Sequence, residues 1–315
     1  MTIWTNAHNL PRPLALQLMM GYRHHSDRIS VTQLIGPARI RQLMIRHAED
    51  KHQPWRDVSE NIWALWGSAI HAVLAGGDNS NALSEEALKV ELRPESDPRG
   101  GYYLTGIPDL YTEDGTLWDY KTSKAFAFCS KNAKPEWVQQ TNIYAWMLRR
   151  HGFPVSRIVI QGFVKDYNRY QAMQHGDYPE SDVPQYEIPM WTDEAVEAFI
   201  RDRVQVHNEA GHVDEAELPL CSEGERWTKP TTYAVKKGDN KRAQRVFDTL
   251  AEAEEFISTS SAPEELWIET RAGEDTRCID YCPAAAFCAY YREKYGDWFE
   301  LHPLDESTII AKEEK

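Results

Sequence analysis

The sequence predicts an α/β fold with a mixed central sheet flanked by helices. Three observations predict it: four segments have apolar residues at helical spacing, four others are rich in β-branched and aromatic residues, and the two kinds are interleaved along the chain. A chain of 315 residues can bury a substantial core, and its 42% hydrophobic and 27% charged residues are typical of a globular protein.

Four helices are expected. Ser30 and Gln33 have the spacing of a capping box, so a helix should run over 30–50, with Pro37 interrupting it. A second helix is expected over 57–77, where apolar residues form a stripe that ends at a Gly-Gly pair. Periodicity and terminal signals predict the other two helices over 134–152 and 192–211.

Four strands are expected, over 87–95, 101–113, 116–123 and 156–167. The pair Asp114-Gly115 between the second and third strands is a favoured hairpin turn, so these two strands should run antiparallel. The fourth strand follows a helix and is expected to join the same sheet. These elements together predict a mixed sheet.

The expected organisation has three parts. Residues 1–29 form an N-terminal extension, 30–211 the core, and 212–315 a C-terminal segment. The apolar run PLALQLMMGY near the start is too short to span a bilayer and has no basic leader before it. A cytoplasmic protein without membrane association is therefore expected.

The charge distribution is uneven. A net charge of −14 argues against a protein that coats nucleic acid by bulk electrostatics. The stretch 226–245 nevertheless holds seven basic residues against the single acid Asp239. It is either a solvated face or a surface that follows phosphates.

The segment GIPDLYTEDGTLWDYKTSK carries a constellation of charged residues on the predicted hairpin. Asp119 and Lys121 lie two positions apart on one strand and so share a side, and Asp109 can approach them across the hairpin. Converging carboxylates repel each other unless a cation lies between them, and Mg²⁺ or Mn²⁺ suits such ligands. Lys121 could then orient an attacking water and offset charge on a phosphate. A single D-x-K also fits a polar, solvent-facing strand.

Four motifs in order carry a resemblance: GSAIH, GIPDLY, DYK and QTNIY. Over about residues 30–165 the chain resembles the RecB-like (AddB-like) branch of the PD-(D/E)XK nucleases, which have a restriction-endonuclease-like core. The resemblance implies metal ligands at His71, Asp109 and Asp119, with Asp119 where many relatives carry Glu. It also implies that Lys121 acts on the attacking water.

A helix carrying Gln140 and Tyr144 would lie beside this site, by the same resemblance. These two residues are either DNA contacts or a packing and hydrogen-bonding pair. Glu91 could reach a metal through water, but a charged strand residue is more simply solvated, so the predicted site omits it.

Four of the five cysteines form a second constellation. Cys278, Cys282 and Cys288 have C-x₃-C-x₅-C spacing, and Cys221 stands upstream. Four thiolates can hold a [4Fe-4S] cluster or structural Zn²⁺, and the alternative is four buried free thiols. Zinc sites usually have two tight pairs, so the spacing favours the cluster. Cys129 is expected to be unligated.

One cysteine plus a C-terminal triplet resembles the iron-sulfur site of AddB-like and CRISPR-adaptation nucleases. In those relatives the separate cysteine precedes the nuclease motifs and the triplet begins C-x₂-C, whereas Cys221 follows the motifs here. The resemblance implies that the cluster fixes the C-terminal segment to the chain.

The expected function is a Mg²⁺- or Mn²⁺-dependent deoxyribonuclease. The whole chain resembles standalone exonucleases of tailed phages, which implies that it degrades DNA from its ends in recombination, replication or repair, in the host cytoplasm and alongside a single-strand annealing protein. A structure-specific or nicking endonuclease fits the residues equally well. A non-catalytic nucleic-acid-binding iron-sulfur protein is the other alternative, although both acids and the lysine are retained. No oligomeric state is predicted.

Overall fold

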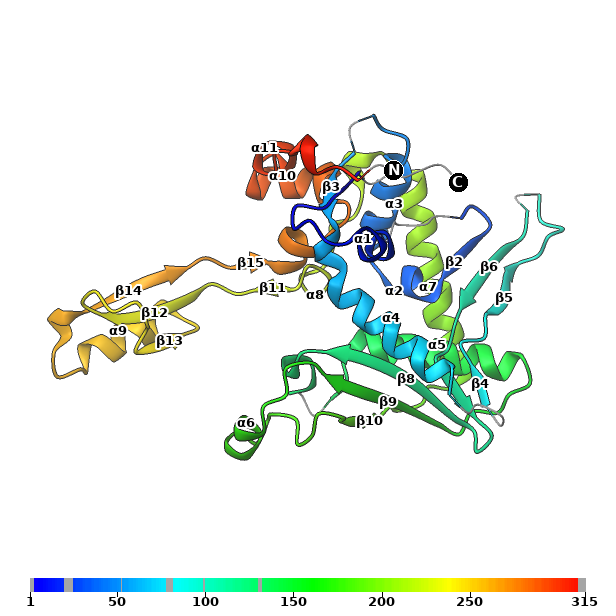
Figure 1. Ribbon diagram of the computed structural model, residues 1–315, viewed down its shortest axis with the longest axis horizontal. Coiled ribbons are helices and arrows are strands. Elements are labelled where there is room, and N and C mark those ends of the chain that lie inside the picture. The colour runs from blue at the N-terminus through cyan, green and yellow to red at the C-terminus, as the bar shows by residue number, and fades with distance from the viewer. Residues whose placement is uncertain are drawn as a thin grey trace. The chain divides into compact units, whose positions relative to one another are not determined.

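The computed structural model describes residues 3–19, 25–51, 53–77, 82–98, 100–129 and 132–310 (Figure 1). The chain divides into two compact units. The first comprises Met1–Glu217 with His302–Lys315, and the second comprises Leu218–Leu301. The expected boundary at residue 212 therefore lies at Leu218, and the expected extension at the N-terminus belongs to the first unit.

A five-stranded mixed sheet is the centre of the first unit. Its order is β10-β9-β8-β7-β4, from the strands Gln185–Glu187 (β10), Arg157–Val164 (β9), Thr116–Ser123 (β8), Leu110–Thr112 (β7) and Ala82–Ser84 (β4). β8 and β9 are parallel, and the other neighbouring strands are antiparallel. The predictions of a mixed sheet and of the turn at Asp114-Gly115, with Gly115 at φ 81°, are confirmed.

A second sheet has the order β2-β6-β5, from Arg28–Ser30, Tyr102–Gly106 and Leu88–Arg93. The expectation of one strand over 101–113 was wrong, because that segment forms β6 in this sheet and β7 in the other. Pro108 lies between them and lacks the N–H that a continuous ladder requires. As a result, Asp109 lies where the chain passes from one sheet to the other.

The four predicted helical segments are confirmed. The helices of the first unit are Arg12–Leu18 (α1), Val31–Ile35 (α2), Ala38–Arg46 (α3), Ile62–Ala75 (α4), Pro135–Arg150 (α5), Arg169–Gln174 (α6) and Asp193–His212 (α7). The capping box at Ser30 and Gln33 is present, and the chain breaks at Gly36-Pro37 between α2 and α3. α4 and α5 both contact β8.

The helices α4 and α5 differ in how far their side chains are buried. α5 carries nine buried residues, including Ile143, Tyr144 and Met147, which pack in the main core with Leu117 of β8 and Ile160 of β9. No described residue of α4 is buried, although it is the most apolar of the predicted helices. The apolar stripe expected on α4 is therefore left at least partly exposed.

The N-terminal residues pack into a smaller core of the first unit. β1 (Ile3–Thr5) pairs in parallel with β3 (Trp55–Asp57). Trp4 and Leu18 are buried against Val58 in this core. α1 holds the described helical part of the apolar run PLALQLMMGY, whose residues 20–22 lie outside the described residues. None of the helices in the described part of the chain combines the length and the apolar character that a membrane span needs.

The second unit has a local architecture that the sequence did not predict. Its helices are Glu223–Arg226 (α8), Leu250–Ser258 (α9), Ala289–Tyr295 (α10) and Trp298–Leu301 (α11), and its strands are Thr228–Lys229 (β11), Thr232–Lys237 (β12), Arg245–Phe247 (β13), Leu266–Arg271 (β14) and Glu274–Asp275 (β15). The strands form a three-stranded antiparallel sheet, β13-β12-β14, and a short pair, β11-β15. α9 contacts all three strands of the larger sheet.

Gly106 at the end of β6 is expected to be intolerant of a side chain. A Cβ there would lie 2.7 Å from a ring carbon of Tyr144 and 3.1 Å from Val31 Cγ2, and both residues are buried. Gly106→Ala should lower the free energy of unfolding by about 1–3 kcal/mol. Gly67→Ala is the control, because nothing lies within 4 Å of its added Cβ on α4. Equal denaturation midpoints for the two variants would contradict this close packing.

Candidate functional site

Asp109 and Asp119 meet at one end of the β7–β8 hairpin. The register that pairs Leu110 with Trp118 and Tyr111 with Leu117 places Asp109 opposite Asp119. The Oδ2 atom of Asp109 accepts a hydrogen bond of 2.6 Å from the backbone N–H of Tyr120, which holds this carboxylate against β8. Both carboxylates are buried.

Asp119 is the most deeply buried of the candidate ligands, with 1% of its surface exposed. Burial raises the pKa of Asp119, the nearby Lys121 opposes this shift, and repulsion from Asp109 adds to it. Lys121 Nζ lies 2.6 Å from Oδ2. Within the described part of the chain, the Oδ1 atom has no hydrogen-bond partner. Such an oxygen is costly to bury, and a bound cation would satisfy it.

His71 and Glu85 complete a cluster around Asp109. Nδ1 of His71 lies 3.3 Å from Asp109 Oδ1 and 3.0 Å from Glu85 Oε1. The possible ligand atoms of these three residues all lie within 4.8 Å of one another. The hydrogen bond to Asp109 and the neighbouring Glu85 raise the pKa of His71 to about 9, against the opposing effect of burial. The site therefore attracts positive charge.

Glu85 is a candidate ligand that the sequence prediction missed. It follows β4, its backbone has φ 55°, and its N–H donates to the carbonyl of Asp109 at 3.2 Å. A left-handed backbone at a residue other than glycine is strained and is often found at functional sites, but no motif in the sequence indicates it here. Glu91, which the predicted site omits, is exposed on β5.

A short relay of hydrogen bonds positions Lys121. Its Nζ donates to Gln140 Oε1 at 3.0 Å, and Gln140 Nε2 donates to the hydroxyl of Tyr144 at 3.1 Å. Tyr144 is buried, with 5% of its surface exposed, so packing and hydrogen bonding explain it better than direct contact with DNA. The contacts and electrostatic interactions described above join all six predicted residues and Glu85 in one neighbourhood.

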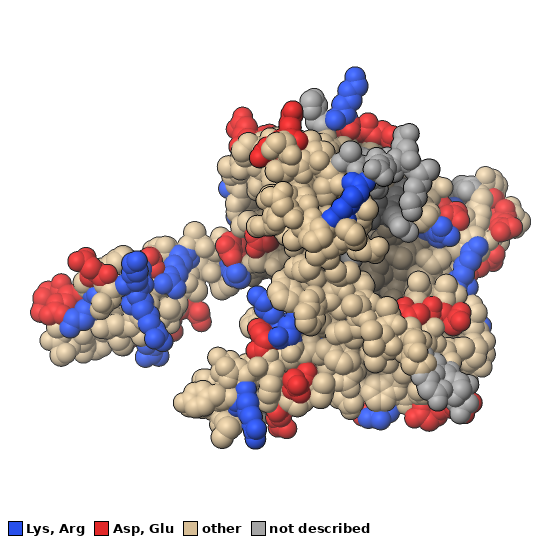
Figure 2. Space-filling view, in the orientation of Figure 1, with Lys and Arg blue, Asp and Glu red and all other residues tan. Residues whose placement is uncertain are grey.

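Much of the basic stretch is neutralised within the second unit. Four of its seven basic residues form ion pairs with acids of the later segment: Arg226 with Asp275, Lys229 with Glu274, Lys236 with Glu269 and Lys237 with Glu265. Figure 2 shows both basic and acidic side chains over β12–β14 and α9. For these four residues the structure favours ion pairing within the second unit over a surface that follows phosphates, with Arg226 and Lys236 mostly buried.

The four candidate cluster cysteines all lie in the second unit. Cys221 precedes α8, Cys278 and Cys282 lie in and after the short helical turn Arg277–Tyr281, and Cys288 caps α10. Burial, together with the electrostatic effect of the other three thiols, raises the pKa of Cys282 to about 12. The four are therefore neighbours. Cys129 lies in the first unit, where its thiol donates to the carbonyl of Ala125.

The spacing of the sulfur atoms bears on the choice of metal. Within the described part of the chain, no three of these thiols lie within 4.8 Å of one another, as His71, Glu85 and Asp109 do. A tetrahedral zinc ion with Zn–S bonds of about 2.3 Å would bring its sulfur ligands within about 3.8 Å of each other. Binding of a zinc ion would therefore require at least some of these thiols to move closer together.

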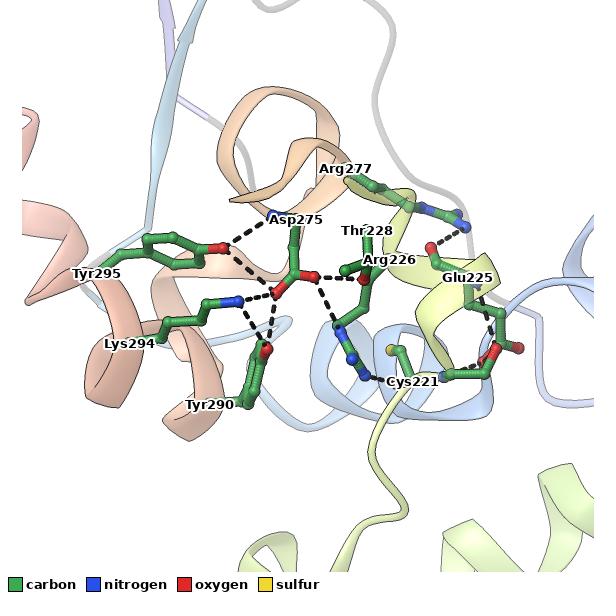
Figure 3. A network of polar contacts seen from close by, with 10 residues as sticks. Cys221, Glu225, Arg226, Thr228, Asp275, Arg277, Tyr290, Lys294 and Tyr295 are labelled. Atoms are coloured by element: carbon green, nitrogen blue, oxygen red, sulfur yellow. Dashed lines mark hydrogen bonds and ion pairs between the residues drawn. The ribbon is translucent and has the colours of Figure 1, made fainter. Parts of the chain in front are cut away.

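Asp275 joins the elements that carry these cysteines (Figure 3). This fully buried carboxylate accepts hydrogen bonds from five side chains: Arg226, Thr228, Tyr290, Lys294 and Tyr295. Arg226 also donates to the backbone carbonyl of Cys221. Burial alone would raise the pKa of Asp275, but these donors hold it below its ordinary range. Asp275 thus ties α8, β11, β15 and α10 together.

Comparison with known proteins assigns no family. No family model matches the chain, and no curated protein matches it. A solved structure described as "Crystal structure of SSO0001" is similar at 15% sequence identity, with a TM-score of 0.40, over 62% of this chain and 83% of that chain. This likeness is too weak to identify the fold family.

Asp275→Asn should destabilise the second unit, because it leaves Arg226 and Lys294 without their shared buried anion. The expected loss is about 3–5 kcal/mol at neutral pH, measured as earlier unfolding or faster proteolysis of residues 218–301. The carboxylate stabilises the fold above its unfolded-state pKa of about 4, and this contribution is lost as the pH falls further. Asp239→Asn, at an exposed site of the same unit, is the control. Equal stability of both variants would contradict the role of Asp275.

Proposed function

We propose that the chain is a divalent-metal-dependent deoxyribonuclease with a core of the PD-(D/E)XK type. The observation that carries this proposal is the meeting of two buried carboxylates, one with an unsatisfied oxygen, beside an anchored lysine. The order of elements agrees with it. A hairpin bears the acids, and the helix α5 and the parallel strand β9 follow.

The residues present fit a hard divalent cation. Asp109, Asp119 and His71 would hold it, and Glu85 would join them or bind through water. Three carboxylates and one imidazole suit Mg²⁺ or Mn²⁺ better than a soft metal. The unsatisfied Oδ1 atom of Asp119 is the buried group that gains most from such an ion. When bound, the ion supplies positive charge that acidifies water and stabilises the phosphate under attack.

Lys121 has a defined role in this proposal. The Asp119 carboxylate and the Gln140 amide hold its ammonium group in place, and Tyr144 holds Gln140. A group fixed in this way can orient the attacking water or donate a hydrogen bond to a phosphate oxygen without reorganising. Gln140 and Tyr144 are then positioning residues, and Lys121 is the catalytic one.

Degradation from DNA ends is the mode of action that we propose. It rests on the resemblance to standalone exonucleases, as does work beside a single-strand annealing protein in recombination, replication or repair. A structure-specific or nicking endonuclease would use the same residues, but it would not need a DNA end to cut.

We also propose that Cys221, Cys278, Cys282 and Cys288 hold a [4Fe-4S] cluster. The spacing of the cysteines in the sequence supports this choice over zinc, because zinc sites usually have two tight pairs, whereas here one cysteine is separate and three are clustered. The Asp275 network brings their elements together, and the cluster would add a second restraint on them. The cluster would then act as a structural staple of the second unit.

Lys121→Ala should abolish most DNA degradation. Purified protein incubated with Mg²⁺ or Mn²⁺ is expected to degrade linear duplex DNA and to leave closed circular DNA intact, with no reaction in chelator. Loss of Lys121 should slow degradation at least about 100-fold, as expected for a group that acts on the transition state. Lys51→Ala, at an exposed lysine of the first unit, is the control.

Three outcomes of this assay would count against parts of the proposal. Intact DNA under every condition would overturn the nuclease and favour a non-catalytic binding protein. Cutting of circular DNA would replace the exonuclease with an endonuclease. Full activity of the Lys121 variant, at a rate equal to that of the Lys51 variant, would remove Lys121 from the catalytic role.

Cys282→Ala should abolish the brown colour expected of anaerobically purified protein, and with it the bound iron and sulfide. The residues 218–301 should become more sensitive to protease, because ligation no longer restrains them. Cys129→Ala is the matched control and should keep both colour and iron. Stoichiometric zinc in colourless wild-type protein would contradict the iron-sulfur assignment, and unchanged protease resistance in the bleached variant would contradict the structural role.

A further inference from the structure

An exposed aromatic surface lies on the first unit and plays no part in the candidate metal site. Trp63 and Trp66, on α4, are 53% and 54% exposed, and their ring centres lie 6.2 Å apart. Phe126, in the short 3₁₀ helix Ala125–Phe128 after β8, is 87% exposed. Large apolar side chains gathered at a surface mark a site of interaction.

Two lysines accompany these aromatic residues. Lys165 Nζ lies 4.8 Å from the centre of the Trp63 ring. The pKa of Lys165 is lowered, mainly by burial and next by the charge of the nearby Lys124. The loops are tied together, because the Ala125 N–H donates to Asp166 Oδ1 at 2.6 Å and the Lys165 N–H donates to the Ser123 carbonyl at 2.9 Å. Two adjacent ammonium groups attract an anionic partner.

This surface adjoins the candidate site through shared elements. Trp63 and His71 are eight residues apart on α4, a rise of about 12 Å along the helix. Lys124 follows Lys121 by three residues at the end of β8, about 10 Å of extended chain. A stacked strand advances about 3.4 Å per nucleotide, so about three or four nucleotides would reach from Trp63 to the site.

We propose that an aromatic–lysine surface binds unpaired DNA and leads it into the candidate site. This surface consists of Trp63, Trp66, Phe126, Lys124 and Lys165. Bases stack on the exposed rings, and phosphates face the two lysines. Single strands are the fitting partner because base pairing and stacking hide the base faces of a duplex. Cleavage of the bound strand rests on the proposed nuclease function, but binding does not.

A binding experiment in chelator separates this proposal from the nuclease activity. Full-length protein is titrated against fluorescently labelled oligothymidylate, an abasic oligomer of the same length, and a duplex, with anisotropy as the readout. Oligothymidylate should bind more tightly than both others, because only it offers phosphates and free base faces together. Equal affinity for the abasic oligomer would show that charge alone drives binding and would overturn the proposal.

Substitutions locate the binding to this surface. Trp63→Ala should weaken oligothymidylate binding about 5- to 150-fold, the effect of losing one base–aromatic stack, and leave abasic binding little changed. Lys165→Ala should weaken both single strands and reduce the slope of log affinity against log salt by about 0.7. Trp267→Ala, at a half-exposed tryptophan of the second unit, is the control and should bind like wild type.

Two further results would overturn the proposal. Wild-type affinity in Trp63→Ala that is folded, as judged by its unfolding midpoint, would exclude stacking at this site. A change in sedimentation mass in Trp63→Ala, with DNA binding unaltered, would show instead that a second copy of the chain covers α4. If wild-type protein degrades linear DNA while either result holds, the proposed nuclease survives and only the aromatic–lysine surface fails.

Discussion

The repulsion between two buried carboxylates is the constraint on which the rest of the first unit depends. Asp109 and Asp119 face each other across β7 and β8, where water cannot screen their charge. Positive or donating groups surround them: Lys121 beside Asp119, and His71 with the Tyr120 N–H beside Asp109. A hairpin that served only stability would not place acids there, since apolar residues of similar size would pack at lower cost. The proposed cation, shared by both carboxylates, would explain the arrangement.

The second unit also buries a carboxylate, but there the charge is compensated by neighbouring side chains. Asp275 is fully buried but receives five side-chain donors, so its charge is compensated within the protein. The two units thus contain opposite kinds of buried acid. Asp275 is a structural anion that needs no further partner, whereas Asp119 retains an oxygen that nothing described in the chain satisfies. This contrast distinguishes the structural carboxylate of the second unit from the proposed metal site of the first.

Local signals in the sequence predicted the elements well, and long-range pairing explains the failures. The capping box at Ser30 and the turn at Asp114-Gly115 act over a few residues, so helices and hairpin could be predicted. The division of segment 101–113 between two sheets depends on partner strands elsewhere in the chain. The same holds for the pairing of Lys236 with Glu269, which lies 33 residues away. The predicted site lacked Glu85 because the approach of Glu85 to Asp109 depends on its left-handed backbone conformation, which no sequence motif indicates.

A crystal of the full chain soaked in Mn²⁺ would test the shared cation most directly, because anomalous scattering locates the ion without assumptions about activity. We predict a strong anomalous peak about 2.0–2.2 Å from a carboxylate oxygen of Asp109 and from Oδ1 of Asp119, with His71 or Glu85 also coordinating. An ion held by His71, Glu85 and Asp109 with Asp119 still unsatisfied, or no ion at millimolar Mn²⁺, would contradict the account.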